Sequence, residues 1–458
     1  MEDLQHTPVY RIFKRELIES CSKMIIYKKN VRNNENRVFN NENIKGTENR
    51  FLDQEEIRKE LSEVFFRFNL GEKKLLVIIP DNSRTAPVDT FFRLFYQEYL
   101  GKVKKIDYLI ALGTHPLLSQ EGMLRRVGIS RKEKNTLYRD IEIFNHRWDR
   151  EDTFTRIGAI EEDEMEALTG GLLRERVDIE INKAVYNYDF LIILGPVFPH
   201  EIAGFSGSNK YLFPGIGGWE FIDLTHWLGA LETNLRIIGK KDTIPRRLID
   251  RAAELVSVPI LYFNLVVDHE GLKGLFIGDD KSAWEKAVEL SSRLNIRYVS
   301  RPYSRVLSIS SKKYEDFWTG AKAFYKIEPM VEEGGEVVVY APHIKDISLT
   351  HASVINQVGF HIKDYFQAHM DIYTLFPRAV LAYSSLVKGA GSYLNGVETT
   401  RVRVVLSSAV PEEECRRLNL DYLDPGKVKV SEWENREDEG AKVVMNAGEV
   451  LYRVTVNN

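Results

Sequence analysis

Short runs of consecutive apolar residues alternate along the chain with stretches in which apolar residues recur every three or four positions. The runs at residues 74–80, 106–113 and 190–194 predict strands that are buried on both faces. The spacing at residues 51–69 and 90–100 predicts helices. Strands that alternate with helices are typical of parallel sheets with crossover helices, so we expect an α/β fold.

The same pattern resumes after residue 278 and predicts a second domain. A helix is expected at residues 282–294 and strands at 305–309 and 336–340, and residues 441–456 are rich in strand formers. A chain of 458 residues is longer than one ordinary domain. We therefore predict two α/β domains with largely parallel sheets, residues 1–278 and 279–439, with an active-site cleft between them.

Composition and charge narrow the class of protein. Apolar residues make up 43% and charged residues 28% of the chain, which is normal for a soluble globular protein. The net charge of −4 gives no basic excess, which argues against a nucleic acid partner. The longest apolar run, residues 190–199, is far shorter than the roughly 20 residues that span a bilayer, so no membrane partner is expected. The Asn-rich residues 30–49 predict a loop or weakly ordered connector.

Two features point to the cytoplasm. The first thirty residues are charged throughout and lack the apolar core of a signal peptide. Cys21 and Cys415 lie far apart and form no Cys-x-x-Cys motif, which argues for a reducing compartment and against a thiolate metal site.

Candidate chemistry gathers where predicted strands end. Asp81, His115 and His200 each lie just past the carboxyl end of a predicted strand. Open α/β sheets bind ligands at this edge, so three such residues predict a small-molecule site. The alternative is that polar residues occur at strand ends in any α/β protein.

The first two motifs are short. Asp81, Ser83 and Arg84 lie in the run Pro-Asp-Asn-Ser-Arg-Thr-Ala-Pro, and the guanidinium fork of Arg84 suits a carboxylate or phosphate. The alternative is that this run forms a strand-end turn with a surface ion pair. His115 follows a Gly-Thr turn, where it is either an acid/base residue or a histidine bonded to a backbone carbonyl.

The third motif, residues 199–218, is the most informative stretch. It combines His200 and Lys210 with Gly and Ser positions that let the backbone approach a ligand, and His226 follows it. A buried lysine can hold a phosphate, a carboxylate or a covalent adduct. No Ser or Thr follows Lys210, so it is no Walker A lysine, and a Rossmann fingerprint also fails. A zinc site built from His115, His200 and His226 is a competing hypothesis.

These motifs resemble the signature of the nickel-pincer lactate racemase family. The resemblance covers most of residues 75–278 and implies two acid/base histidines, His115 and His200, a lysine that tethers the cofactor, Lys210, and a nickel ligand, His226. It also implies the cofactor, a pyridinium-3-thioamide-5-thiocarboxylic acid mononucleotide that carries Ni(II), with contacts from Asp81, Ser83 and Arg84. Substrate contacts are implied for Arg84, Trp318 and Lys322. In this family the chain end returns to the first domain, which implies that residues 440–458 complete it.

Two departures from the family pattern bear on the substrate. Thr319 replaces the Gln of the family's aromatic-Gln-Ala-x-Lys element, and Gly207-Ser208-Asn209-Lys210 replaces Gly-Gly-[Arg/Ser]-Lys. Neither removes a proposed catalytic group. They predict a substrate other than lactate, such as a larger 2-hydroxy acid, a sugar acid or a dicarboxylate.

The resemblance implies a racemase or epimerase of a 2-hydroxy acid, an isomerase that uses the nickel-pincer nucleotide as a transient hydride acceptor. Cofactor-synthesis enzymes would load it. Two alternatives stay open: a zinc-dependent hydrolase that uses the same histidines, and a non-catalytic protein that binds the nickel cofactor or a carboxylate.

Overall fold

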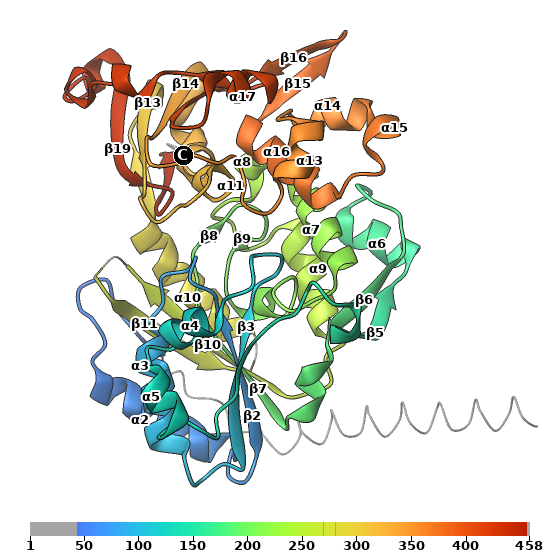
Figure 1. Ribbon diagram of the computed structural model, residues 1–458, viewed down its shortest axis with the longest axis vertical. Helices are drawn as coiled ribbons and strands as arrows, with labels where there is room; N and C mark the ends of the chain where they lie inside the picture. The colour runs from blue at the N-terminus through green and yellow to red at the C-terminus, as the bar shows by residue number, and fades with distance from the viewer. Residues whose placement is uncertain (1–43, 269, 280, 456–458) are drawn as a thin grey trace, which may run out of the picture. The chain divides into compact units, whose positions relative to one another are not determined.

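Two largely parallel sheets organise the chain in the computed structural model (Figure 1), which describes residues 44–268, 270–279 and 281–455. Residues 44–458 form one compact unit. Cys21 and most of the predicted connector at 30–49 lie outside the described residues. The expected α/β class with largely parallel sheets is confirmed, whereas the division into two domains at residue 278 stays a prediction.

The first sheet has seven strands in the order β1-β11-β10-β7-β2-β3-β4, and its middle pairs are parallel. Its strands are β1 (Ile44–Gly46), β2 (Lys74–Pro80), β3 (Lys105–Ala111), β4 (Ile143–Asn145), β7 (Phe190–Pro196), β10 (Ile260–Val267) and β11 (Leu272–Gly278). The antiparallel edge strands β11 and β1 depart from the parallel pattern. A tight turn causes this departure, because Asp268 accepts the Gly271 N–H and the chain folds straight back.

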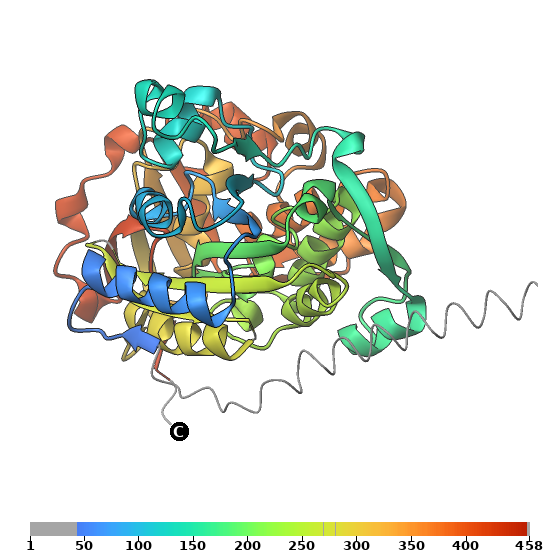
Figure 2. The ribbon, with the colours of Figure 1, turned by 90° about the horizontal axis from the view of Figure 1, so that it is seen from below.

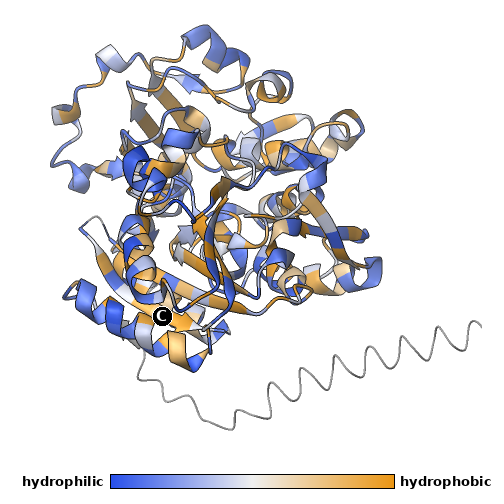
Figure 3. Ribbon diagram, turned by 60° about the horizontal axis from the view of Figure 1, so that its bottom comes forward, coloured by the Kyte–Doolittle hydropathy of each residue, from blue (hydrophilic) through white to orange (hydrophobic). Residues whose placement is uncertain are grey.

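Both faces of the first sheet are buried, which explains the uninterrupted apolar run of β2. Leu75 and Val77 pack in one cluster with residues of α2 (Gln54–Arg67) and α3 (Val88–Tyr99). Figure 2 shows these two helices on one face of the sheet from below. Leu76 packs on the opposite face in one cluster with residues of α7 (Trp219–Glu232) and α9 (Ile244–Ala253). In Figure 3 the strands are accordingly largely hydrophobic, while hydrophilic residues predominate on the outer helices.

The second sheet has five parallel strands in the order β18-β17-β14-β13-β19. They are β13 (Tyr303–Ser310), β14 (Val331–Ala341), β17 (Arg403–Ser408), β18 (Asp421–Tyr422) and β19 (Ala441–Ala447). Val306 and Val337 face the larger core, together with α16 (Arg378–Lys388). Leu307 and Val338 face a small cluster that Trp433 covers.

The end of the chain pairs with strands of the C-terminal half, and the expectation that residues 440–458 complete the N-terminal domain stays a prediction. β19 pairs with β13 in the second sheet, and β20 (Leu451–Val454) pairs with β12 (Ile296–Val299). Contact with the N-terminal half comes from Arg453, whose guanidinium donates to the carbonyl oxygens of Leu235 and Ile238. A parallel neighbour of matching length in β13 explains why β19 joins the second sheet.

The three predicted helices are present, with slightly different ends. α2 begins at Gln54, because Asp53 accepts the backbone N–H of Glu56 and the Glu56 side chain accepts that of Asp53. The remaining helices are α4 (Gln120–Arg126), α5 (Arg131–Asn135), α6 (Glu162–Thr169), α8 (Asn234–Ile237), α10 (Lys281–Asn295), α11 (Phe317–Gly320), α12 (Lys322–Tyr325), α13 (Ala352–Val358), α14 (Lys363–Ala368), α15 (Met370–Tyr373) and α17 (Glu412–Arg417). Two-stranded ribbons are formed by β5 (Phe154–Ile160) with β6 (Val177–Asn182), β8 (Pro199–His200) with β9 (Gly204–Phe205), and β15 (Gly391–Leu394) with β16 (Val397–Thr400). Within the described ranges, none of the helices has the length and apolar character needed to cross a bilayer.

Candidate active site

The carboxyl ends of three adjacent strands meet at one pocket. β7, β2 and β3 are neighbours in the first sheet, and His200, Asp81 and His115 follow their ends. The pocket encloses about 750 Å³, part of it open to solvent. Eight of the nine residues proposed for the site line it: Asp81, Ser83, Arg84, His115, His200, Lys210, His226 and Trp318. The ninth, Lys322, lines a smaller neighbouring pocket that shares Ser83 and Arg84 with the first.

His115 is paired with a carboxylate. Its Nδ1 lies 2.5 Å from Asp81 Oδ2, and the Ser83 hydroxyl and backbone N–H donate to Asp81 Oδ1. Burial alone would raise the pKa of Asp81, but the neighbouring His115 and the Ser83 hydrogen bond outweigh it and leave that pKa below its usual value. Because Nδ1–H donates to Asp81, the lone pair of neutral His115 lies on Nε2. This arrangement suits a base, since the carboxylate stabilises the imidazolium that forms.

His200 has the opposite setting. Its Nδ1 accepts the backbone N–H of Ile202 at 3.1 Å, so the proton of the neutral ring lies on Nε2. The side chain is buried, and burial together with the charges of Lys210 and Arg84 holds the pKa of His200 well below its usual value. The Glu201 carboxylate lies 3.6 Å from Nδ1, next to a ring that stays neutral. At rest, His200 is therefore a hydrogen-bond donor.

His226 lies on α7, a helix that is apolar on most of its faces because it is largely buried. Its Nδ1 donates to the carbonyl oxygen of Ile222, one turn earlier, at 2.6 Å. Burial lowers the pKa of His226 to about 4, so the ring is neutral at physiological pH. Nε2 then carries a free lone pair, which is the state that a metal-ligating histidine needs.

Lys210 follows a backbone that only glycine adopts easily. Gly207 has a φ of +87°, and a Cβ there would lie 2.6 Å from Val197 Cγ2. Burial, together with the nearby Arg84 charge, lowers the pKa of the Lys210 ammonium to about 7. A substantial fraction of the amine is therefore uncharged at neutral pH and able to act as a nucleophile.

Asn209, one of the departures from the family pattern, anchors this turn. Its amide donates to Asp250 Oδ1 at 3.0 Å, and its carbonyl accepts from the Tyr262 hydroxyl. Lys281 also pairs with Asp250, at 2.9 Å. The residue before the lysine is thereby fixed to α9 and β10.

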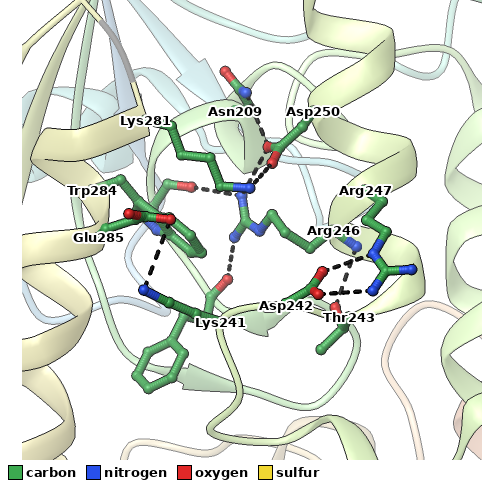
Figure 4. Close-up of polar contacts among 12 residues, drawn as sticks. Asn209, Lys241, Asp242, Thr243, Arg246, Arg247, Asp250, Lys281, Trp284 and Glu285 are labelled. Carbon is green, nitrogen blue, oxygen red and sulfur yellow. Dashed lines mark hydrogen bonds and ion pairs between the residues drawn. The ribbon is translucent and has the colours of Figure 1, made fainter.

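Arg246 holds the preceding loop from behind (Figure 4). Its guanidinium donates to the carbonyl oxygens of Phe205 and Gly207 and lies over the Trp284 ring, 4.4 Å from its centroid. The Trp284 indole in turn donates to the Ser206 carbonyl at 2.8 Å. Donors from α9 and α10 thus bind three successive carbonyl oxygens, which holds the loop in the conformation that directs Lys210 to the pocket.

The side chains at this site suit a metal ion whose other ligands are supplied by a cofactor. Across residues 44–268, 270–279 and 281–455, no three His, Cys, Asp or Glu side chains are grouped as a metal site. A zinc centre held by His115, His200 and His226 is therefore not assembled in this structure. A single imidazole with a free nitrogen near the half-buried amine of Lys210 does fit a tethered, metal-bearing pincer group.

Several residues around the pocket were not predicted. Glu201 and Lys326 are buried, and both interact electrostatically with Arg84 and Lys322. Glu201 directly follows His200, and Lys326 lies four residues after Lys322, so the helical spacing was a usable signal. Tyr383 stacks on Trp318 with ring centroids 4.3 Å apart, and its position on α16 carried no such signal.

Thr319 does not contribute to the pocket lining in the way its position suggests. Its hydroxyl donates to Asp316 Oδ1 at 2.6 Å and helps to cap α11. Among the described residues that line the two pockets, Thr319 does not occur. A Thr319→Gln substitution would therefore affect the substrate only indirectly, through the position of the neighbouring Trp318.

These features define an α/β protein with a small-molecule site of acid–base character at the carboxyl edge of a parallel sheet. Residues 33–237 match the lactate racemase N-terminal domain. Curated lactate racemases from Thermoanaerobacterium thermosaccharolyticum and Lactiplantibacillus plantarum are 24% identical over 278 residues and 25% identical over 279 residues. In each case the match covers 59% of this chain and 60% of the relative, so the chain spans less than two thirds of the length of these relatives.

Solved structures agree with this assignment. A Thermotoga maritima protein is 30% identical, with a TM-score of 0.80 over 88% of this chain and 99% of that one. The lactate racemase apoprotein from T. thermosaccharolyticum is 18% identical and shares the fold, with a TM-score of 0.68 over 90% of this chain and 94% of that one. The chain belongs to the lactate racemase-like family.

Proposed function

We propose that this protein is an isomerase, a racemase or epimerase of a 2-hydroxy acid. The observation that carries the proposal is the contrast between two histidines on one pocket. His115 presents a lone pair on Nε2 with a carboxylate behind it, whereas His200 presents an N–H. A hydroxyl group placed between them meets one acceptor and one donor, which is what its deprotonation requires.

The chain's own groups divide the work. Arg84 lines the pocket without a hydrogen-bond or ion-pair partner in the described part of the chain, so its fork is free to hold the substrate carboxylate. His115 takes the hydroxyl proton and later returns it, while His200 donates a hydrogen bond to the same oxygen. For the mirror-image substrate the roles exchange, and His200 must then release its bond to the Ile202 N–H. The two histidines are therefore not equivalent.

Lys210 and His226 would hold the nickel-pincer nucleotide, the lysine as covalent tether and the histidine as the ligand to Ni(II). When bound, this group would supply a reversible hydride acceptor for the hydrogen on C2 of the substrate. Trp318 and Tyr383 line the pocket, Tyr383 beside the His226 ring, and they would shield the reacting carbon from water. Loading would require cofactor-synthesis enzymes as partners, and a cytoplasmic setting agrees with Cys415 being a buried free thiol.

Co-expression with cofactor-synthesis enzymes tests this proposal. Intact-mass and metal analysis should find an added mass on Lys210 and about one nickel per chain. Lys210→Ala should abolish retention of the group, whereas Lys183→Ala, at an exposed lysine outside the pocket, should not. Zinc without an adduct would favour the hydrolase alternative. If nickel and an adduct are present but no 2-hydroxy acid is inverted, the alternative of a non-catalytic protein that binds the nickel cofactor would be favoured.

A further inference from the structure

A second, smaller pocket adjoins the candidate active site. It spans about 330 Å³, part of it open to solvent, and shares Ser83 and Arg84 with the larger pocket. Its remaining walls carry Lys313, Tyr314, Lys322, Lys326 and Glu449 among others. The proposed reaction and cofactor binding assign no role to Lys313, Lys326 or Glu449.

Neither of the two buried lysines of this pocket forms an ion pair with a carboxylate in the described part of the chain. Lys322 is 7% exposed, and in the described part of the chain it makes no hydrogen bond or ion pair, only a contact 5.5 Å above the Tyr314 ring. Lys326 is 4% exposed and donates only to the backbone carbonyl of Glu449, at 3.1 Å. Burying an ammonium without a counter-charge is unfavourable, so a nearby anion would stabilise both.

The nearby carboxylates do not form ion pairs with these two ammonium groups. Glu449 already pairs with Lys313 at 2.5 Å and accepts from the Tyr314 hydroxyl at 2.9 Å. Four cations therefore line the pocket with one engaged carboxylate. Glu201 lies within electrostatic reach of Arg84, Lys322 and Lys326 but outside the lining. Burial lowers the pKa values of Lys322 and Lys326 to about 8, although the Glu201 charge acts in the opposite direction.

We propose that the smaller pocket binds a second acidic group of the substrate, so that the substrate is a 2-hydroxy acid with a distal carboxylate. Arg84 lies between the pockets and holds the carboxylate next to the reacting carbon, while Lys322 and Lys326 hold the distal one. This inference rests on the proposed function and narrows its substrate class from any 2-hydroxy acid to a dicarboxylate.

Equilibrium binding to the protein without cofactor tests the inference separately from turnover. The probes are malate and 2-hydroxybutyrate, which have the same chain length and differ in a distal carboxylate or methyl group. Calorimetry should find malate bound roughly 10- to 100-fold more tightly, the range expected for a charge-assisted contact. Lys326→Met should remove most of this preference, and Lys313→Met, at a more exposed position, should reduce it. Lys312→Met, at the exposed neighbour outside the pocket, should leave it unchanged.

Equal binding of the two acids would overturn the inference. So would tight binding of nicotinate mononucleotide that depends on Lys326 without a preference for malate, because the pocket would then serve a cofactor phosphate. The loaded enzyme separates this inference from the proposed function. Inversion of 2-hydroxybutyrate as fast as malate refutes the dicarboxylate inference alone, whereas a malate preference in binding without inversion of either acid refutes the racemase proposal alone.

Discussion

At the scale of single residues, the hydrogen-bond partner of Nδ1 decides the chemistry of each histidine. His115 donates from Nδ1 to a carboxylate, His200 accepts on Nδ1 from a backbone N–H, and His226 donates from Nδ1 to a carbonyl. Under the proposed function, three copies of one side chain would thus supply the pocket with a base, a hydrogen-bond donor and a metal ligand. Burial keeps His200 and His226 neutral, which preserves this division at physiological pH.

Replacement of either acid/base histidine should remove turnover while leaving the metal in place. His115→Ala and His200→Ala should each lower turnover of the loaded enzyme by about 10²-fold or more. Nickel content should stay near that of the unaltered enzyme, because His226 and Lys210 hold the group. Loss of nickel in either variant, measured by elemental analysis, would show that the altered histidine is a ligand instead.

The Lys210 amine should react at an unusually low pH. Its pKa of about 7 means that the uncharged form grows as pH rises through 7, whereas an ordinary lysine stays protonated until about pH 10. Labelling of the cofactor-free protein with acetic anhydride from pH 6 to 9 should therefore give a rate at Lys210 that levels off above about pH 8. Peptide mass spectrometry with the exposed Lys59 as internal reference reads this out. A rate that keeps rising tenfold per pH unit at Lys210 would contradict the lowered pKa.

Sequence alone could locate these residues but not their protonation states. The residue types and the strand-end positions of Asp81, His115 and His200 were sufficient to predict one site, because parallel strands end at a common edge. The tautomers depend on partners such as Ile202 N–H and Ile222 O, and these follow from the exact path of the loop and helix. Lys322 was predicted, but its placement in the smaller pocket required the second sheet to be in position.

At the scale of elements, the glycine-rich loop between β7 and α7 is held by side chains of α9, α10 and β10. Arg246, Trp284 and Asn209 together bind the loop backbone or bridge it to Asp250 and Tyr262. None of these contacts is local in sequence, so no motif in residues 199–218 reveals them. Asn209, which looks like a departure from the family pattern, thus helps to hold the turn that carries Lys210, the proposed tether.

Removal of the Asn209 amide should loosen the tether. Asn209→Ala breaks two hydrogen bonds and should lower the free energy of unfolding by about 1–3 kcal/mol. The labelled fraction of Lys210 should also become more like that of an exposed lysine, because the turn no longer holds it in the buried position. The matched control is Asn187→Ala at an exposed asparagine. Additive effects of Asn209→Ala and Asp250→Ala on unfolding in urea would refute the coupling of the two side chains.

At the scale of the whole molecule, cations from both halves of the chain converge on one place. Arg84 and Lys210 come from the N-terminal half, and Lys322 and Lys326 from the segment between β13 and β14. Each interacts electrostatically with Glu201, which is buried among them. The two sheets were predictable from hydrophobic patterns, whereas this convergence depends on how they pack. At the chain end, β19 lies in the second sheet beside its parallel neighbour β13.

The unliganded protein should become more stable as the pH rises from about 8 to 9.5. In the folded state Lys322 and Lys326 have pKa values of about 8, below the roughly 10.4 of an unfolded lysine. Between these values the unfolded state binds more protons, so the free energy of unfolding increases with pH, by up to about 1.4 kcal/mol per pH unit for each lysine. Urea unfolding at several pH values measures the slope. Lys322→Met should flatten it, and a slope unchanged in that variant would contradict the uncompensated charge.

The central claim is that this pocket inverts a 2-hydroxy acid by removing and returning the hydrogen on C2. The most direct measurement incubates the cofactor-loaded enzyme with single enantiomers of malate, lactate and gluconate in deuterated buffer. Chiral chromatography follows inversion, and mass spectrometry follows deuterium at C2. We predict inversion, fastest for malate, with most product retaining its original hydrogen at C2. Full deuteration at C2 would instead indicate simple deprotonation by His115 and His200, and the absence of inversion for every acid would contradict the racemase assignment.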